Sequence, residues 1–154
     1  MALTQAEADV LLQMAKVFVD TDPIEFSVTQ PMSQERALRS TDRREEFTLN
    51  LERGGRTRAR LKYQTRARRL FVLARLELAG RRHWNPPESP YKGGEWISRT
   101  HLHLYREGFE DRVAYELADV PFWVGRDVSN GVTTLEHFLR FCGVAGWPPI
   151  QISI

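Results

Sequence analysis

Alternating apolar and polar residues around a glycine pair constrain this chain more than any other feature. The segment EEFTLNLERGGRTRARLKY (45–63) has apolar residues at every second position on both sides of Gly54-Gly55. A period of two is typical of a strand with one buried face, and Gly-Gly between two such runs is a strong hairpin signal. The sequence therefore predicts a hairpin whose apolar faces carry Phe47, Leu49 and Leu51, then Ala59, Leu61 and Tyr63.

Further alternating runs extend this predicted sheet. RLFVLARLEL (69–78) predicts a third strand, and THLHLYRE (100–107) with RVAYELA (112–118) predicts a second hairpin. IEFSVT (24–29) indicates an edge strand, whereas residues 30–44 fit a short strand and an irregular link equally well. Together these runs predict about five strands. On the third strand, one side is expected to carry Leu70, Val72, Ala74, Leu76 and Leu78.

A capping-box pattern marks a helix near each end of the chain. Thr4 with Glu7 opens the first helix, and apolar residues at helical spacing extend it to an expected end near Asp20. Thr133 with Glu136 opens the second helix, whose apolar stripe is Leu135, Phe138, Leu139 and Cys142. The two helices are expected to cover one face of the sheet.

The composition fits a single soluble domain. The 154 residues suffice for one core, so the predicted fold is α+β over residues 1–154, a twisted antiparallel sheet flanked by an N-terminal and a C-terminal helix. A single cysteine, Cys142, excludes an intramolecular disulfide and a cysteine-built zinc site. No run of 18 apolar residues predicts a membrane span, and the first residues lack the pattern of a secretory signal. A cytoplasmic location is the resulting expectation.

Positive charge is concentrated in the middle of the chain. Residues 53–82 hold eleven basic side chains and one acidic, whereas residues 1–52 hold five basic and ten acidic. Four cations occur at alternate positions, so they would share one strand face: Arg56, Arg58, Arg60 and Lys62. Such a face is a track for nucleic-acid phosphates, a surface for an acidic protein partner, or a solvated face with cross-strand partners.

A long segment without periodicity follows the third predicted strand. Residues 80–99 contain three of the eight prolines, and a loop of this length is more often functional or mobile than incidental. Arg81, Arg82 and Trp84 are candidate nucleic-acid-binding residues, because unpaired bases stack on aromatic rings and guanidinium planes. The alternative is that the loop's aromatic rings, including Tyr91 and Trp96, pin it onto the sheet.

The stretch THLHLYREG (100–108) is the clearest candidate for catalysis. On a strand, His101, His103 and Tyr105 share one face. Metal-free cleavage of RNA needs a general acid, a general base and cations, and histidine titrates near neutral pH. We therefore name His101 and His103 as the acid and base candidates, with help from His83, Tyr105 and Arg106.

Two alternative roles for these histidines stay open. A His-x-His pair supplies two metal ligands, which His83 and a carboxylate such as Glu95 or Glu107 would complete. Otherwise the histidines are structural, or they bind without chemistry. Nothing in the spacing requires a metal, so the sequence leads us to assign neither a metal nor another cofactor.

Part of the chain resembles a known group of proteins. RHWNPPE, RTHLHLYREGFEDRVAYEL and TTLEHFLRFCGV, within about 83–144, resemble a family of small uncharacterised proteins of bacteria and their mobile elements. This resemblance implies a bacterial or phage setting. The layout is also similar to toxin nucleases of toxin–antitoxin modules, small sheet-built proteins in which a histidine near a strand cleaves RNA. That similarity is one of arrangement and transfers no catalytic residue.

The expected function is nucleic-acid binding, with RNA favoured, combined with metal-independent endoribonuclease activity of toxin type. The first alternative is a non-catalytic interaction protein that meets an acidic partner, such as an antitoxin or a phage inhibitor of a host defence complex. The second is a metal-dependent enzyme. The C-terminal IQISI (150–154) is a candidate edge strand and a candidate homodimer contact.

Overall fold

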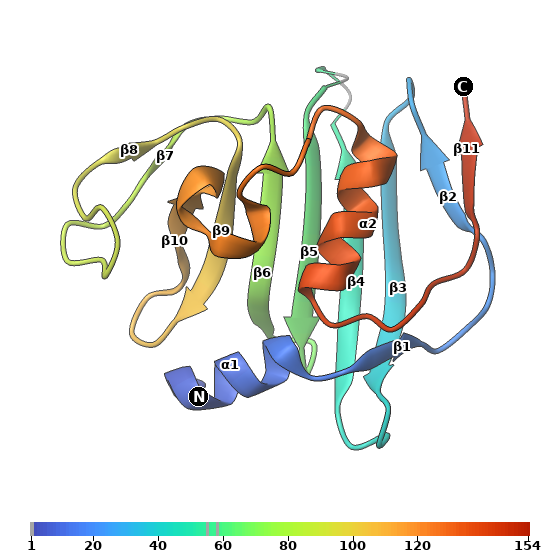
Figure 1. The fold of residues 1–154 in the computed structure, drawn as a ribbon, viewed down its shortest axis with the longest axis horizontal. Helices are drawn as coiled ribbons and strands as arrows, with labels where there is room; N and C mark the ends of the chain where they lie inside the picture. The colour runs from blue at the N-terminus through green and yellow to red at the C-terminus, as the bar shows by residue number, and fades with distance from the viewer. Residues whose placement is uncertain (1, 55, 58) are drawn as a thin grey trace.

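The computed structural model describes residues 2–54, 56–57 and 59–154, and one antiparallel sheet of seven strands forms its centre (Figure 1). In spatial order these strands are β1 (Lys16–Phe18), β3 (Met32–Ser40), β4 (Glu46–Arg53), β5 (Leu61–Ala67), β6 (Phe71–Leu78), β9 (His101–Arg106) and β10 (Glu110–Glu116). The α+β class is confirmed, but the strand count of about five is too low. One reason is β3, because the stretch that the sequence left undecided is a nine-residue strand.

Two small sheets and two helices complete the fold. β2 (Ile24–Ser27) pairs in parallel with β11 (Ile150–Ser153), and β7 (His83–Trp84) pairs antiparallel with β8 (Trp96–Ile97). The C-terminal edge strand is therefore confirmed, and the homodimer stays a prediction. The helices are α1 (Gln5–Gln13) and α2 (Gly131–Phe141), with short 3-10 turns at Leu117–Asp119 and Pro121–Trp123. Among the described residues, no helix has the length and apolar character to cross a membrane.

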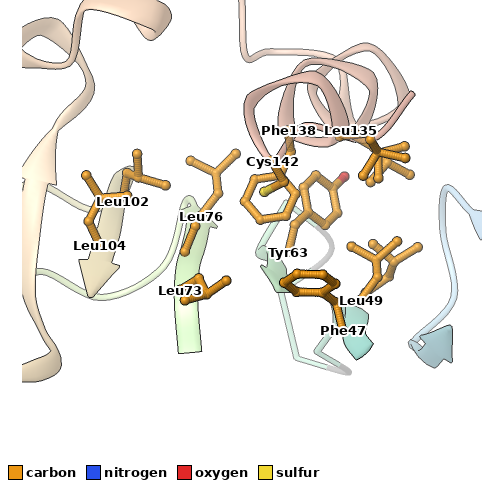
Figure 2. Packing of buried hydrophobic residues seen from close by; sticks show 14 of the residues in the cluster. Phe47, Leu49, Tyr63, Leu73, Leu76, Leu102, Leu104, Leu135, Phe138 and Cys142 are labelled. Atoms are coloured by element: carbon orange, nitrogen blue, oxygen red, sulfur yellow. The ribbon is translucent and has the colours of Figure 1, made fainter. Parts of the chain in front are cut away.

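The core lies between α2 and the face of the sheet that it crosses (Figure 1). Figure 2 shows Phe138 of α2 and Cys142, the C-cap of this helix, facing Tyr63. The Tyr63 and Phe138 ring centroids are 6.1 Å apart. Cys142 is fully buried, so the prediction that it belongs to the core is confirmed. The helix starts two residues before the expected Thr133, because Asn130 is its N-cap and accepts a hydrogen bond from the Thr133 amide.

The first helix is shorter than the sequence predicts. Its capping box is present, but α1 ends at Gln13 instead of continuing to about Asp20. Residues 16–18 pair with β3 as strand β1 instead, and Lys16 is fully buried there. The Lys16 Nζ donates to the carbonyls of Leu11, Leu12, Met14 and Cys142 at 2.7–2.9 Å. One ammonium thus satisfies carbonyls at the C-terminal ends of both helices, which would otherwise lack partners.

A bulge in β6 sets which of its side chains face the core. Ala74 pairs with Thr65 and Val72 with Arg66, so Leu73 is an extra residue between them. Leu73 and Ala74 are both buried, whereas Leu70 lies in the preceding turn and is 67% exposed. The expected continuous face from Leu70 to Leu78 is therefore wrong at its beginning, because a bulge shifts the alternation by one residue.

Candidate functional site

Cross-strand register brings the candidate residues together on the sheet face opposite the core. β6 and β9 pair so that Glu77 lies opposite His101 and Arg75 lies opposite His103. The residues between them, Leu76 and Leu102, are fully buried in the core that α2 covers. Because strand side chains alternate, two histidines, one carboxylate and one guanidinium are gathered on the other face.

Three ligand-type atoms converge at this point. The Nε2 atoms of His101 and His103 are 3.1 Å apart. The Oε2 atom of Glu77 lies 3.2 Å from the His103 Nε2 and 3.6 Å from the His101 Nε2. Both imidazoles are 1% exposed, whereas the Glu77 side chain is 16% exposed. We refer to Glu77, His101 and His103 as the HHE cluster.

The hydrogen bonds of the other ring nitrogens define the tautomers. The His101 Nδ1 lies 2.6 Å from the Ser98 carbonyl oxygen, and the His103 Nδ1 lies 2.8 Å from the Asp111 carbonyl oxygen. A carbonyl only accepts, so each Nδ1 carries a hydrogen and donates it. In the neutral form of each ring, the lone pair is then on Nε2 and points into the HHE cluster.

Burial and neighbouring charges shift the ionisation of two cluster members. Burial lowers the pKa of His103 to about 4, and the contact with Glu77 opposes that shift only in part. Burial would raise the pKa of Glu77, but its contacts with His101 and His103 and the charge of Arg75 outweigh this and hold the pKa well below its usual range. The Glu77 side chain is therefore an ionised carboxylate at neutral pH.

Arg75 contacts two carboxylates, those of Glu77 and Asp111. Its Nε lies 3.4 Å from the Glu77 Oε2, and its Nη1 lies 2.6 Å from the Asp111 Oδ2. Arg60 approaches the second oxygen, with its Nη2 4.0 Å from the Glu77 Oε1. Two guanidiniums, Arg75 and Arg60, therefore face two carboxylates, Glu77 and Asp111, and the closest of these ion pairs is the one between Arg75 and Asp111.

The long segment 80–99 delivers His83 to the same region by folding along the open edge of β10. The His83 Nε2 donates to the Arg112 carbonyl at 2.8 Å, and the Asn85 side chain bonds the Ala114 backbone. The His83 ring centroid lies 4.6 Å from that of His103 and 5.9 Å from that of His101. The structure therefore brings together all three predicted histidines, although the converging set of donor atoms does not include His83.

The other predicted helpers lie elsewhere. The Tyr105 hydroxyl donates to the Leu3 carbonyl and accepts from the Leu3 amide, so it holds the N-terminal segment. Arg106 donates from its Nε to the Tyr115 hydroxyl at 2.7 Å. Of the two carboxylates considered as ligands, Glu107 bonds the Gln5 amide, and Glu95 is exposed.

Sequence reasoning missed Glu77 as a member of the site. This residue is the one acidic side chain among residues 53–82, and it alternates with Arg75 on the face opposite Leu76. Those two signals single it out as a partner for cations, but they do not give its register. Only the pairing of Glu77 with His101 shows that it meets the histidines.

The basic residues before β5 do not form the expected strand face. β5 begins at Leu61, which pairs with Arg53, and the described residues between them (54, 56–57 and 59–60) belong to no strand. Arg56 and Arg60 are exposed, and Arg58 lies outside the described residues. Lys62 is on the strand, but its Nζ pairs with Glu52 at 2.9 Å. The predicted alternating track is therefore wrong, whereas nucleic-acid binding by these residues stays a prediction.

Arg81, Arg82 and Trp84 are all exposed near β7, as a binding role requires. Trp84 packs edge to face against Trp96 of β8, with ring centroids 5.3 Å apart. The Arg82 guanidinium carbon lies 4.7 Å from the centroid of the Trp96 ring. These residues form a second surface, separate from the HHE cluster, which we call the tryptophan platform: Arg82, Trp84 and Trp96.

Comparison with known proteins places the chain in a family without a described activity. No curated protein and no solved structure matches the chain. One family model does match, and it covers residues 3–144, well beyond the segment 83–144 that carries the sequence resemblance. The match includes α1, the seven-stranded sheet and α2, and hence both candidate surfaces. The chain belongs to DUF6978, a family of unknown function.

Proposed function

We propose that this protein binds a divalent transition-metal ion of the Zn²⁺ class through Glu77, His101 and His103. The observation that carries the proposal is the convergence of two imidazole Nε2 atoms and one carboxylate oxygen at separations of 3.1, 3.2 and 3.6 Å. Two nitrogens and one oxygen are a donor set that suits Zn²⁺ and other borderline divalent ions.

The separations match the edges of a coordination tetrahedron. Zinc bonds to histidine nitrogen and carboxylate oxygen are about 2.0–2.2 Å long, so ligand atoms at tetrahedral angles lie about 3.3–3.6 Å apart. The three separations in the HHE cluster lie within or close to this range. Little movement is therefore needed for Glu77, His101 and His103 to contact one ion at the same time.

The surroundings of the cluster supply what metal-binding histidines usually need. A ligating imidazole almost always donates its second nitrogen to a carbonyl or carboxylate, which fixes the ring orientation. His101 does so to Ser98, and His103 does so to Asp111. The Arg75 guanidinium lies closer to the Asp111 carboxylate than to that of Glu77, so it leaves the Glu77 Oε2 able to contact a cation.

Three protein ligands leave a fourth position, the arrangement of catalytic rather than structural zinc sites. A metal-bound water there would be a nucleophile near neutral pH, which supports a metal-dependent hydrolase as the reaction class. Metal-free ribonuclease activity stays the alternative, and a cleavage assay with and without a chelator distinguishes the two.

The first test is the metal content of the untagged protein. We expect about one equivalent of bound metal by elemental analysis, and titration of the stripped protein with Zn²⁺ to recover it. Glu77→Gln and His103→Ala should each lower the affinity by at least tenfold. His137→Ala is the matched control, because its ring is on α2, outside the HHE cluster, and it should bind as the wild type does. Folded Glu77→Gln and His103→Ala variants that bind Zn²⁺ with wild-type affinity would contradict the site.

The second test asks what the site does. Labelled single-stranded RNA and DNA are incubated with wild type and with the double variant His101→Ala/His103→Ala, each with and without EDTA. Cleavage that EDTA abolishes and the double variant lacks supports a metal-dependent nuclease. Cleavage that persists in EDTA but is lost in the double variant supports the acid–base alternative. Intact substrate in every lane removes nuclease activity on these substrates and leaves metal binding to be judged by the first test.

A further inference from the structure

We propose that the tryptophan platform binds single-stranded nucleic acid by stacking unpaired bases on Trp84 and Trp96. The two side chains are 45% and 54% exposed, although indole rings are among the largest apolar groups in a protein. The observation is independent of the HHE cluster, so this proposal does not rest on metal binding.

The two tryptophans are not needed to hold segment 80–99 on the sheet. Asn85 and Ile97, both fully buried, anchor the segment from inside. Tyr91 anchors the middle of the segment, because its hydroxyl donates to the Asp119 Oδ2 at 2.6 Å and its ring stacks on that of Tyr115 with centroids 4.4 Å apart. These buried residues and contacts hold the segment on the sheet. Packing of the segment therefore does not explain why Trp84 and Trp96 are exposed.

The arrangement of β7 and β8 separates the platform from the buried side of the hairpin. His83 pairs with Ile97, and Trp84 pairs with Trp96. Successive strand residues point to opposite sides, so His83 and Ile97 face the protein while Trp84 and Trp96 face solvent. The exposed fractions agree with this, because Ile97 is fully buried and its neighbour Trp96 is half exposed.

Positive charge next to the rings favours a nucleic acid over an apolar partner. The Arg82 guanidinium lies against Trp96, and Arg81 and Arg99 are exposed close by in the chain. Segment 80–99 carries four basic residues against two acidic ones, Glu88 and Glu95. Stacking on an aromatic ring with an arginine beside it is how unpaired bases and their phosphates are bound, with little dependence on sequence.

The exposed rings of Trp84 and Trp96 favour a single-stranded nucleic acid over a duplex. Bases in a duplex are stacked on one another, so their flat faces are not available to Trp84 or Trp96. A single strand offers free base faces, and its phosphates can reach Arg81 and Arg82. We therefore expect single-stranded RNA and DNA to bind and a duplex of the same sequence to bind more weakly.

The experiment measures fluorescence anisotropy of a short labelled oligouridine titrated with the full chain. The double variant Trp84→Ala/Trp96→Ala should weaken binding by at least about tenfold. Trp84→Phe/Trp96→Phe should recover most of the affinity, because phenyl rings still stack. Val124→Ala is the matched control, since Val124 is an equally exposed apolar side chain on another part of the surface. Thermal melts of each variant confirm that it is folded.

A salt titration separates the role of the arginines from that of the rings. Each phosphate contact with a single strand contributes about 0.7 to the slope of log affinity against log salt, so Arg81→Gln/Arg82→Gln should reduce the slope by about 1.4. Four results would overturn the proposal. They are no binding by the wild type, wild-type affinity in the folded Trp84→Ala/Trp96→Ala variant, duplex binding as tight as single-strand binding, or an unchanged slope in the arginine variant.

Discussion

The side-chain amide of Asn85 bonds the backbone of Ala114 as a neighbouring strand would. Its Nδ2 donates to the Ala114 carbonyl, and its Oδ1 accepts from the Ala114 amide, both at 2.9 Å. Ala114 lies in β10, the last strand of the main sheet, whose outer edge would otherwise present unpaired groups. His83 and Tyr91 bond the same edge at Arg112 and Glu116. Segment 80–99 therefore covers the edge through side chains, and in doing so brings His83 beside His103.

The first prediction concerns this edge. Asn85→Ala removes three side-chain hydrogen bonds, one to the Tyr91 carbonyl and two to Ala114, whose buried amide and carbonyl are left without partners. We therefore expect a loss of about 2–4 kcal/mol in the free energy of unfolding. Urea denaturation measures it. Glu88→Ala, at an exposed position of the same segment, should change stability by less than about 0.5 kcal/mol. A similarly small effect for Asn85→Ala would show that the edge does not depend on this side chain.

The second prediction links the proposed metal to stability. An ion that binds only the folded chain stabilises it by about 2.7 kcal/mol when its free concentration is 100 times the Kd. Zn²⁺ should therefore raise the melting temperature of the stripped wild type, and EDTA should reverse the rise. Glu77→Gln should lose the response, whereas His137→Ala should keep it. An equal response in Glu77→Gln would place the binding elsewhere.

The third prediction tests the buried ammonium of Lys16. Lys16→Met fills similar space but leaves the carbonyls of Leu11 and Cys142, among others, without a donor. We expect a loss of about 3 kcal/mol or more, because buried acceptors are then unsatisfied. Lys62→Met is the matched control at a partly exposed position, where the ion pair of Lys62 with Glu52 contributes at most about 1 kcal/mol. Chemical denaturation of the two variants compares them directly.

The fourth prediction follows from the pKa of Lys16. Burial lowers this pKa to about 8, whereas a lysine in the unfolded chain titrates near its usual value of about 10.4. Between these two pKa values the unfolded chain binds more protons than the folded chain does, so the contribution of Lys16 to the free energy of unfolding rises with pH. The free energy of unfolding of the wild type relative to Lys16→Met should increase from pH 8 to pH 10. A difference that falls over this range would contradict the depressed pKa.

The fifth prediction concerns the close approach of the two helix ends. Gly143 follows α2 with a φ of 77°, and a Cβ there would lie 2.7 Å from the Met14 carbonyl oxygen. Gly108 has a similar φ of 86° but no atom within 4 Å of such a Cβ. Both alanine substitutions carry the strain of a positive φ, so the extra destabilisation of Gly143→Ala measures the backbone contact alone. Equal melting temperatures for the two variants would argue against the contact.

Local patterns determine a large part of this fold. Alternation identifies β4, β6, β9 and β10, and a capping box and an apolar stripe identify α1 and α2, because each signal lies within one short stretch of chain. The apolar face of β6 shows where that reasoning stops. The bulge at Leu73 depends on how β6 pairs with β5, and no pattern within β6 reveals it.

The sequence likewise predicted some residues of the candidate site and not others. The sequence by itself identified His83, His101 and His103, since the residue types and the alternation of the strand are local. It did not identify Glu77 as their partner, because that contact depends on the register between β6 and β9, which are far apart in the chain. Nor could it show that Asn85 bonds the edge of β10 or that residues 16–18 pair with β3 instead of extending α1. Those outcomes are decided by pairing and burial between distant segments, which only the tertiary structure contains.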